Sequence, residues 1–341
     1  MSEAEDSTAG GEASAYGVVD QITSYQQSAL IGTAVELGLP NALYENRRTL
    51  DQLTTELGTD ARGTMGLLSG LVEFGMVERT GDQFGLTPNG ELLADDHPDS
   101  IAMISRKEWF FYKLWVEMPE AVRTGHTQTR AWRDRLENDP DQAHDFLRAL
   151  DDLCRLYGGD LPELAGPLVV DGSPARLLDV GGGAGSHAAN LVGANPGLEA
   201  TVLDLPGAEP VLRERHPDLD FVAGDIDLPR FGRPEDEQWD FVLVSNILHD
   251  HPAGDNERII REAASLLAPG GSLVIYEWVI DEGRTSPPGV ASFTPMMVIE
   301  NEGGWTWTEN EIGEWLRAAG LEPRPASKGP GPIAVIKATR P

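Results

Sequence analysis

Apolar side chains recur at helical spacing through the first part of the chain. The segment 22–39 predicts one amphipathic helix, ended by Gly38 and Pro40, with apolar residues every three to five positions: Ile22, Tyr25, Leu30, Ala34 and Leu37. Two shorter helices are predicted after it. One covers 49–58 with Thr49 as its N-terminal cap, and the other covers 60–74.

A β-hairpin is predicted directly after these helices. The runs 76–80 and 83–87 flank a Gly-Asp turn signal at 81–82. Helix, turn, helix and hairpin together look like a winged helix, a module that often binds DNA. DNA affinity depends on Lys and Arg side chains that neutralise phosphates, yet the second helix and the hairpin offer only Arg62 and Arg79. We therefore expect no nucleic acid partner.

The second half of the chain alternates short apolar runs with helical segments. Runs typical of buried strands lie at 175–178, 199–203, 241–244 and 273–276. This order predicts an α/β domain with a Rossmann-like sheet. The preceding stretch, 95–165, is predicted to be mostly helical. It contains six large apolar side chains within ten residues: Trp109, Phe110, Phe111, Tyr112, Trp115 and Met118. These side chains form either part of the core or the wall of a pocket for a flat, apolar ligand.

Composition favours a soluble, cytoplasmic protein of two domains. The 341 residues are enough to bury a sizeable core. A single cysteine, Cys154, excludes an internal disulfide and a cysteine-rich metal site. No apolar run reaches the roughly 18 residues of a membrane span, so no membrane partner is expected. The acidic first 15 residues do not look like a signal peptide, and we expect them to be a disordered tail.

The charge balance is unusually acidic. The chain has 56 acidic residues against 26 Lys and Arg, a formal charge of −30, and only four lysines. Self-repulsion on this scale is relieved by screening ions. Because the acids are spread along the whole chain, we hypothesise a halophilic protein from a host with high internal salt. An ordinary acidic enzyme is the alternative.

A glycine-rich turn, LLDVGGGAGSH at 177–187, predicts close approach of backbone N–H groups to a cofactor at a helix N-terminus. Two cofactor classes use such a turn. Gly183, Gly185 and Ala188 satisfy the GxGxxA pattern of dinucleotide sites, with Asp204 about 20 residues on. The same turn, read as D-x-G-x-G-x-G from Asp179, resembles the first motif of class I S-adenosylmethionine (SAM)-dependent methyltransferases.

Three later stretches favour the methyltransferase interpretation. In order, FVAGDID (221–227), WDFVLVSNILHDHP (239–252) and LLAPGGSLVIYEWVI (266–280) resemble the small-molecule O-methyltransferases typified by caffeic acid and acetylserotonin O-methyltransferases. The resemblance covers roughly residues 20 to 325.

The resemblance implies a domain organisation and a reaction. Residues 16–95 would be a winged-helix dimerisation domain, 96–165 a helical linker and wall of the substrate pocket, and 166–341 the SAM-binding domain. The protein would be a homodimer that methylates a hydroxyl of a small aromatic or quinone- or polyketide-like acceptor and releases S-adenosylhomocysteine. No metal is expected, because the magnesium-dependent catechol methyltransferases lack the N-terminal module.

The resemblance also implies the residues that bind SAM. Asp179 and the glycines Gly181, Gly183 and Gly185 would hold the methionine portion and the ribose edge. Asp204, followed by Leu205, would accept both ribose hydroxyls, since paired carboxylate oxygens suit a vicinal diol. The remaining positions carried over contact the adenine ring or the rest of the cofactor: Asp225, Ile226, Ser245 and Asn246.

His249 is the expected catalytic base. A phenol is mostly protonated at neutral pH, so a base must take its proton while the hydroxyl oxygen attacks the methyl group. His249 follows the predicted strand 241–244, at the carboxyl end where α/β enzymes place their chemistry, and it stands in the family's LHD motif beside Asp250. Glu277 falls where the family places one of two acids that flank the base.

The remaining expectations concern the acceptor pocket and two positions at which this sequence departs from the family pattern. Acceptor contacts are carried over to Trp109, Trp115, Phe146, Met296 and Trp305. Thr306 stands where the family has its second acid, for which Glu300 and Glu302 are the candidate substitutes, and Ser245 stands where a basic residue is common. A SAM-binding relative that hydroxylates or regulates instead of methylating therefore remains an alternative.

Overall fold

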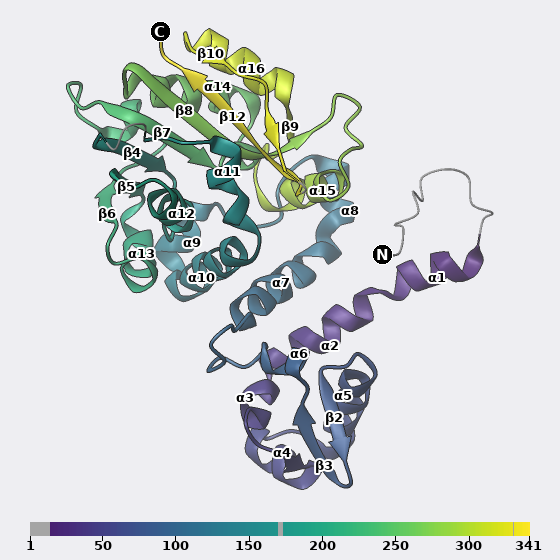
Figure 1. Ribbon diagram of the computed structural model, residues 1–341. Helices are drawn as coiled ribbons and strands as arrows, with labels where there is room; N and C mark the ends of the chain where they lie inside the picture. The colour runs from purple at the N-terminus through teal and green to yellow at the C-terminus, as the bar shows by residue number, and fades with distance from the viewer. Residues whose placement is uncertain (1–13, 170–172, 330) are drawn as a thin grey trace, which may run out of the picture. The chain divides into compact units, whose positions relative to one another are not determined.

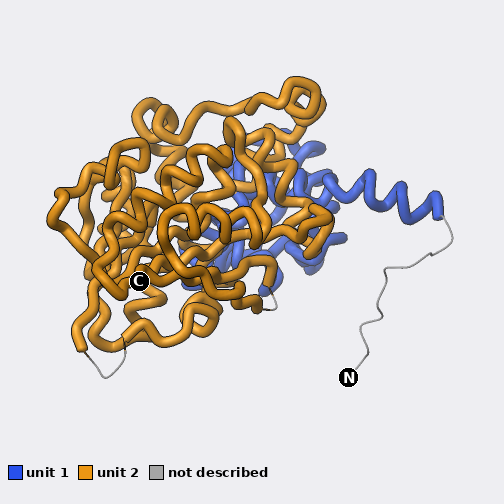
Figure 2. Tube along the Cα trace, turned by 90° about the horizontal axis from the view of Figure 1, so that it is seen from above, with its two compact units in different colours: residues 1–105 blue, residues 106–341 orange. Residues whose placement is uncertain are grey.

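The computed structural model describes residues 14–169, 173–329 and 331–341, which divide within one helix into two compact units, 1–105 and 106–341 (Figure 2). The first 13 residues of the expected disordered tail lie outside the described residues. Residues 14 and 15 do not belong to a tail, because Ser14 caps the first helix and Ala15 begins it.

The first unit combines helices with a small antiparallel sheet in the order β1-β3-β2. Thr49 forms a capping box with Gln52, and Gly58 ends that helix at a φ of 65°, as predicted. Its elements are α1 (Ala15–Thr23), α2 (Tyr25–Glu36), α3 (Leu39–Leu43), β1 (Arg48–Thr49), α4 (Leu50–Leu57), α5 (Ala61–Glu73), β2 (Val77–Thr80), β3 (Gln83–Leu86) and α6 (Pro88–Glu91), and the units divide within α7 (Ala102–Leu114).

The prediction of a single helix over 22–39 is wrong. The structure has two helices there, α1 and α2, separated at Ser24. The hydroxyl of Thr23 donates to the carbonyl of Val19 (2.9 Å) and that of Ser24 to the carbonyl of Gln21 (2.8 Å), so side chains compete for backbone acceptors at the break. Ala34 is buried as expected, whereas Ile22 is 65% exposed.

The second unit is built on a nine-stranded sheet with the main order β10-β12-β8-β7-β4-β5-β6, to which β11 and β9 add at β12 and β8 (Figure 1). The neighbours β7-β4-β5-β6 and β7-β8 run parallel, and β12 pairs antiparallel with β8. The strands are β4 (Ala175–Val180), β5 (Leu198–Asp204), β6 (Asp220–Ala223), β7 (Trp239–Ser245), β8 (Leu267–Ile280), β9 (Trp307–Thr308), β10 (Glu322–Pro323), β11 (Ser327–Lys328) and β12 (Ile333–Thr339).

Helices cover both faces of this sheet, because successive strand residues point to opposite sides. Leu178 and Val242 pack in the core that includes α14 and α16, whereas Leu177 and Leu243 pack in the core that includes α11 and α12. The helices are α8 (Met118–Thr124), α9 (Trp132–Asn138), α10 (Pro140–Tyr157), α11 (Leu161–Ala165), α12 (Ser186–Ala194), α13 (Glu209–Arg215), α14 (Ala253–Ser265), α15 (Val290–Glu300) and α16 (Glu309–Ala318).

The chain order reverses on the two sides of β4, since β5 lies on one side and β7 on the other. In open α/β sheets, ligands bind beyond the carboxyl ends of the strands at such a reversal. The glycine turn follows β4 and His249 follows β7, so the topology brings both to this place. Within the described residues, no helix is long and apolar enough to cross a bilayer.

Candidate active site

The glycine turn leaves no room for side chains. Gly181, Gly183 and Gly185 have φ values of 68°, 54° and 85°, which L residues with side chains rarely adopt. A Cβ at Gly181 would lie 2.5 Å from the Ile247 side chain, and one at Gly182 would lie 2.4 Å from Oδ2 of Asp179. The turn therefore presents bare backbone before α12 begins at Ser186.

Two carboxylates face this turn. Asp179 is fully buried, and neither of its oxygens has a hydrogen-bond partner among the described residues. Burial, together with the charge of Asp204, raises the pKa of Asp179 to about 7. Asp204 accepts from the backbone N–H of Gly183 (2.8 Å) and of Leu205 (2.7 Å), while burial raises its pKa to about 6. Both groups are acceptors in a place poor in donors.

The other expected cofactor residues have protein partners. Asp225 accepts at Oδ1 from Nη2 of Arg133 (2.8 Å); although burial opposes it, this bond lowers the pKa of Asp225. Ile226 packs against the main core. Ser245 is buried, and Asn246 has a φ of 53° with its amide nitrogen 3.2 Å from a His187 ring nitrogen, while its carbonyl oxygen is unpartnered within the described chain.

His249 is held by a buried carboxylate. Its Nδ1 lies 2.6 Å from Oε1 of Glu277, and both side chains are buried. Burial alone would lower the pKa of His249, but the charges of Glu277 and Asp250 raise it to about 9. The Phe293 ring contacts the imidazole edge to face at 5.0 Å and stacks on Trp278 at 4.3 Å. The imidazole is therefore fixed in orientation and unusually basic.

Further acids surround the other ring nitrogen. Nε2 of His249 lies 3.5 Å from Oδ1 of Asp250, which accepts from the Asn301 amide at 2.6 Å. Glu300 is buried, and burial together with the charge of Asp250 raises the pKa of Glu300 to about 7. Glu300 accepts from Nη1 of the buried Arg135 at 3.3 Å.

The structure distinguishes the two glutamates that could substitute for the acid missing at Thr306. The Thr306 hydroxyl lies 2.6 Å from that of Thr294, and the residue is fully buried. Of the two candidate substitutes, Glu302 is exposed and bonds His126, whereas Glu300 is buried and its charge acts on His249. The structure thus favours Glu300 over Glu302 as the second acid near the base.

The predicted acceptor residues do not all gather in one place. Phe146 and Met296 pack together with Phe110 and Phe111. Trp109 instead stacks on Tyr112 at 5.0 Å, and Trp115 is 41% exposed.

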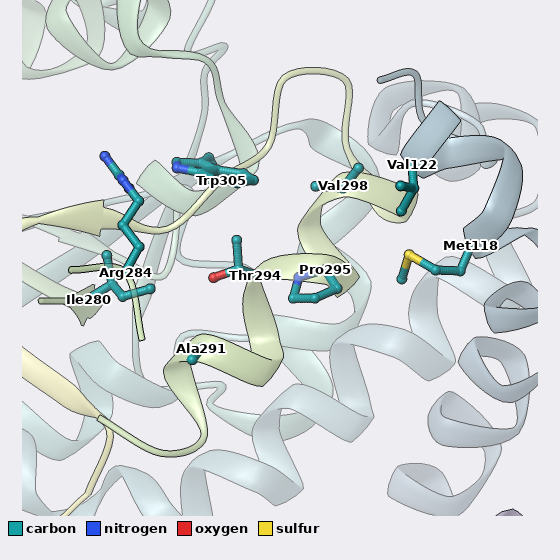
Figure 3. A pocket seen from close by; sticks show the side chains of 9 residues that line it. All are labelled: Met118, Val122, Ile280, Arg284, Ala291, Thr294, Pro295, Val298 and Trp305. Atoms are coloured by element: carbon teal, nitrogen blue, oxygen red, sulfur yellow. The ribbon is translucent and has the colours of Figure 1, made fainter. Parts of the chain in front are cut away.

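A cavity of about 300 Å³ lies along α15 (Figure 3), and two of its lining residues, Met118 and Val298, belong to the same cluster as Phe146 and Met296. Trp305 lines it together with Thr294, Pro295 and Val298, which come from α15, and Arg284. Phe293 of the same helix contacts His249 but does not line the cavity. Trp305 bridges the two regions, because its backbone N–H donates to the carbonyl of His249 at 2.9 Å.

Sequence reasoning missed Arg135, Phe293 and Lys107 in this region. Lys107 carried a signal, since it is one of four lysines and lies two residues before the aromatic run that begins at Trp109. Arg135 and Phe293 carried none. Within the described chain, no group of three or more His, Cys, Asp or Glu side chains is arranged to hold a metal ion.

Comparison with known proteins identifies the family. The O-methyltransferase domain model matches residues 115–322, more than half of the chain, and the O-methyltransferase dimerisation domain model matches residues 19–96. The chain belongs to the O-methyltransferase family. The resemblance seen in the motifs is thereby confirmed, and so is the fold of a Rossmann-like methyltransferase domain preceded by a helical dimerisation domain.

Relatives of the chain include streptomycete O-methyltransferases. The chain is 31% identical to the tetracenomycin polyketide synthesis 8-O-methyl transferase TcmO of Streptomyces glaucescens, over 93% of this chain and 94% of that protein. It is 28% identical to the 3-hydroxy-5-methyl-1-naphthoate 3-O-methyltransferase of Streptomyces sahachiroi, over 94% and 95%.

Solved structures share the fold over nearly the whole chain. Human N-acetylserotonin methyltransferase in complex with SAM superposes with a TM-score of 0.82 at 21% identity, covering 98% of this chain and 99% of that one. The mitomycin 7-O-methyltransferase MmcR superposes with a TM-score of 0.80 at 25% identity, covering 96% and 97%.

SAM is the methyl donor of this family and the cofactor of this O-methyltransferase. Family membership therefore decides against the dinucleotide interpretation of the glycine turn. The residues present also fit SAM: Asp179 offers two buried oxygens without a hydrogen-bond partner among the described residues, and the glycine turn carries no side chains that would cover its backbone. Ribose hydroxyls and a cationic amino group are the donors that such acceptors lack.

Proposed function

We propose that this O-methyltransferase methylates a phenolic hydroxyl of an aromatic, polyketide- or quinone-like acceptor, with His249 as the general base. The observation that carries the proposal is the 2.6 Å contact between His249 Nδ1 and Glu277 Oε1, at the carboxyl edge of the parallel sheet. It leaves Nε2 as the nitrogen that accepts the proton of the acceptor.

The basicity of the imidazole suits this role. Bound SAM supplies an electrophilic methyl group on a cationic sulfonium. The residues of the chain then need to make the acceptor oxygen nucleophilic. An unperturbed phenol has a pKa of about 10, so an imidazole with a pKa of about 9 is well matched for taking its proton. The cost is that only about one enzyme in a hundred carries a neutral His249 at pH 7.

The surroundings and the relatives support an aromatic acceptor. Phe146 and Met296 belong to an apolar cluster with Phe110 and Phe111, and such surfaces suit flat rings. The relatives named above act, by their names, on a tetracenomycin polyketide and on a hydroxynaphthoate. A homodimer in which the N-terminal domain holds two copies together is part of the proposal.

The test is a screen of phenols, naphthols and quinols with SAM at high KCl. S-adenosylhomocysteine release gives the rate, and mass spectrometry gives the position methylated. His249→Ala is the matched control, since the proposal requires it to bind SAM and fail to transfer methyl. If SAM binds but no acceptor in the panel is methylated, the non-methylating alternative replaces this proposal.

A further inference from the structure

A buried guanidinium bonds one of the acids whose charge acts on the proposed base. The side chain of Arg135, in α9, is only 5% exposed. Its Nη1 donates to Oε1 of Glu300 at 3.3 Å, whereas Nε and Nη2 have no hydrogen-bond partner among the described residues. Leaving charged donors buried and unpaired is costly, so a ligand group or ordered water must satisfy them when the protein works.

The two free nitrogens lie on the same edge of the guanidinium. Nε–H and the outer N–H of Nη2 point in parallel, the arrangement that binds both oxygens of one carboxylate. The bond to Glu300 uses the remaining nitrogen and leaves this edge intact. The edge therefore selects a planar group with two acceptor oxygens.

Aromatic rings surround the same guanidinium. Its Cζ lies 4.9 Å from the ring centre of Phe146, 5.2 Å from that of Trp132 and 5.3 Å from that of Phe110. These rings exclude water and strengthen any charge pairing at Arg135. They belong to or contact the apolar cluster assigned above to the acceptor.

The charges around Arg135 include cations as well as acids, although the chain is strongly acidic. Glu300 is the acid that Arg135 bonds, and the charge of a second cation, Lys107, also acts on Glu300. Glu300 in turn acts on Asp250 and His249. Arg135 and His249 thus belong to one buried network of charges, in which a cation holds two unused donors.

We propose that Arg135 is the specificity-determining residue for an acceptor that carries a carboxylate. The free guanidinium edge binds the carboxylate while the acceptor's hydroxyl reaches His249. This inference rests on the proposed function and narrows its substrate class from phenols to aromatic hydroxy acids.

The first experiment needs no variant. A panel of hydroxynaphthoates is compared with the matching carboxamides and parent naphthols, using the full-length enzyme with SAM at high KCl. We expect at least one hydroxynaphthoate to exceed its carboxamide by tenfold or more in kcat/KM. Equal rates for every acid and its amide would overturn the proposal.

The second experiment changes the guanidinium. Arg135→Met keeps the length and apolar packing, and it should bring the ratio of kcat/KM for the acid to that for its carboxamide close to one, whatever it does to the absolute rates. Arg135→Lys keeps the charge without the paired edge and should fall between the two. Arg130→Met, at an exposed arginine just before α9, is the control expected to keep the full preference. If Arg135→Met slows acid, amide and naphthol equally, Arg135 is only structural.

Binding separates this inference from the proposed function. Calorimetry with the enzyme loaded with S-adenosylhomocysteine measures affinity for each hydroxynaphthoate and its carboxamide without any methyl transfer. A tighter acid whose advantage disappears in Arg135→Met supports the arginine site even if no acceptor is methylated. Equal affinities for acids and amides would contradict it even if naphthols are methylated.

Discussion

The Nδ1 atom of His249 lies 2.6 Å from Oε1 of Glu277, and the same carboxylate accepts from the backbone N–H groups of Leu248 at 2.9 Å, His249 at 3.3 Å and Trp278 at 2.7 Å. Glu277 therefore fixes both the imidazole and the backbone of the single-turn helix Leu248–Asp250 that carries it. Replacing His249 and replacing Glu277 should therefore reduce the rate of methyl transfer by different amounts.

Replacing His249 by Ala should reduce methyl transfer by about 10²–10⁴-fold, the usual contribution of a positioned general base. SAM affinity should stay within about threefold, because the proposed role of His249 is toward the acceptor. Glu277→Gln should cost less in rate, since it orients the base without taking the proton. Single-turnover rates and SAM titrations measure both. A loss under tenfold in His249→Ala would mean that proximity alone carries the reaction.

The rate of the wild-type enzyme should rise with pH from 7 toward 9. Only neutral His249 accepts a proton, and the charges of Glu277 and Asp250, acting against burial, raise its pKa to about 9. Below that value the rate should change about tenfold per pH unit. Acceptors of different acidity provide the control, because an inflection due to His249 stays fixed while one due to the acceptor moves. A rate that is flat from pH 6 to 9 would contradict the role of His249.

Asp204→Asn should weaken SAM binding by about 1–3 kcal/mol, because an amide has one acceptor oxygen where the ribose diol is expected to need two. Asn is a better test than Ala, since it keeps the shape of the side chain and one of the two acceptors that bond the backbone N–H groups of Gly183 and Leu205, whereas Ala removes both. Calorimetry gives the affinity, and the melting temperature of the free protein shows whether the turn survives. Unchanged SAM affinity would remove Asp204 from the site.

Asp179→Asn should stabilise the protein without cofactor at pH 8 and weaken SAM binding. The folded-state pKa of Asp179 is raised to about 7 by burial and by Asp204. Its contribution to stability is thus complete below its ordinary value and is lost as pH rises through 7. Removing the ionised carboxyl should regain roughly 2–4 kcal/mol, seen as a higher melting temperature. Asp236→Asn, at an exposed residue, is the control; equal melting temperatures for wild type and Asp179→Asn would refute the prediction.

Stability should increase with salt. With a formal charge of −30 the chain repels itself, and ions shorten the range of that repulsion to about 3 Å at 1 M. Thermal unfolding in dilute buffer and in molar KCl gives the comparison, and choline chloride at the same ionic strength separates screening from specific potassium binding. Equal melting temperatures in all three would end the hypothesis of a salt-adapted protein.

Short sequence patterns predicted those features of the fold that depend on residues adjacent in the sequence. The glycine turn after β4 and the hairpin at Gly81 were predictable because positive φ at glycine has a short-range signature. The neighbours His249 and Glu277 were predictable only through motifs, since His249 follows β7 and Glu277 lies on the adjacent strand β8, 28 residues further along the chain. The break at Ser24 escaped prediction because the apolar spacing continues across it.

The contacts that define the acceptor region were beyond any local pattern. Arg135 and Glu300 are 165 residues apart and meet only through tertiary packing. Within the aromatic run, spacing alone did not separate Phe111, which is 1% exposed, from Trp115, which is 41% exposed. These two residues differ in burial because the helix that contains Phe111 ends at Leu114, before Trp115.

The first helix gives the protein a dependence on its own concentration. None of the described residues of α1 is buried, and Tyr16, Val18, Val19 and Ile22 are all more than half exposed. An isolated helix of nine residues is marginal in water, and in the homodimer proposed above, which the dimerisation domain from residue 19 supports, a second copy would cover α1. The fraction of molecules in which these residues are helical then rises with protein concentration by mass action. On dilution the N-terminal segment should unwind and become open to proteases before any strand of the central sheet does.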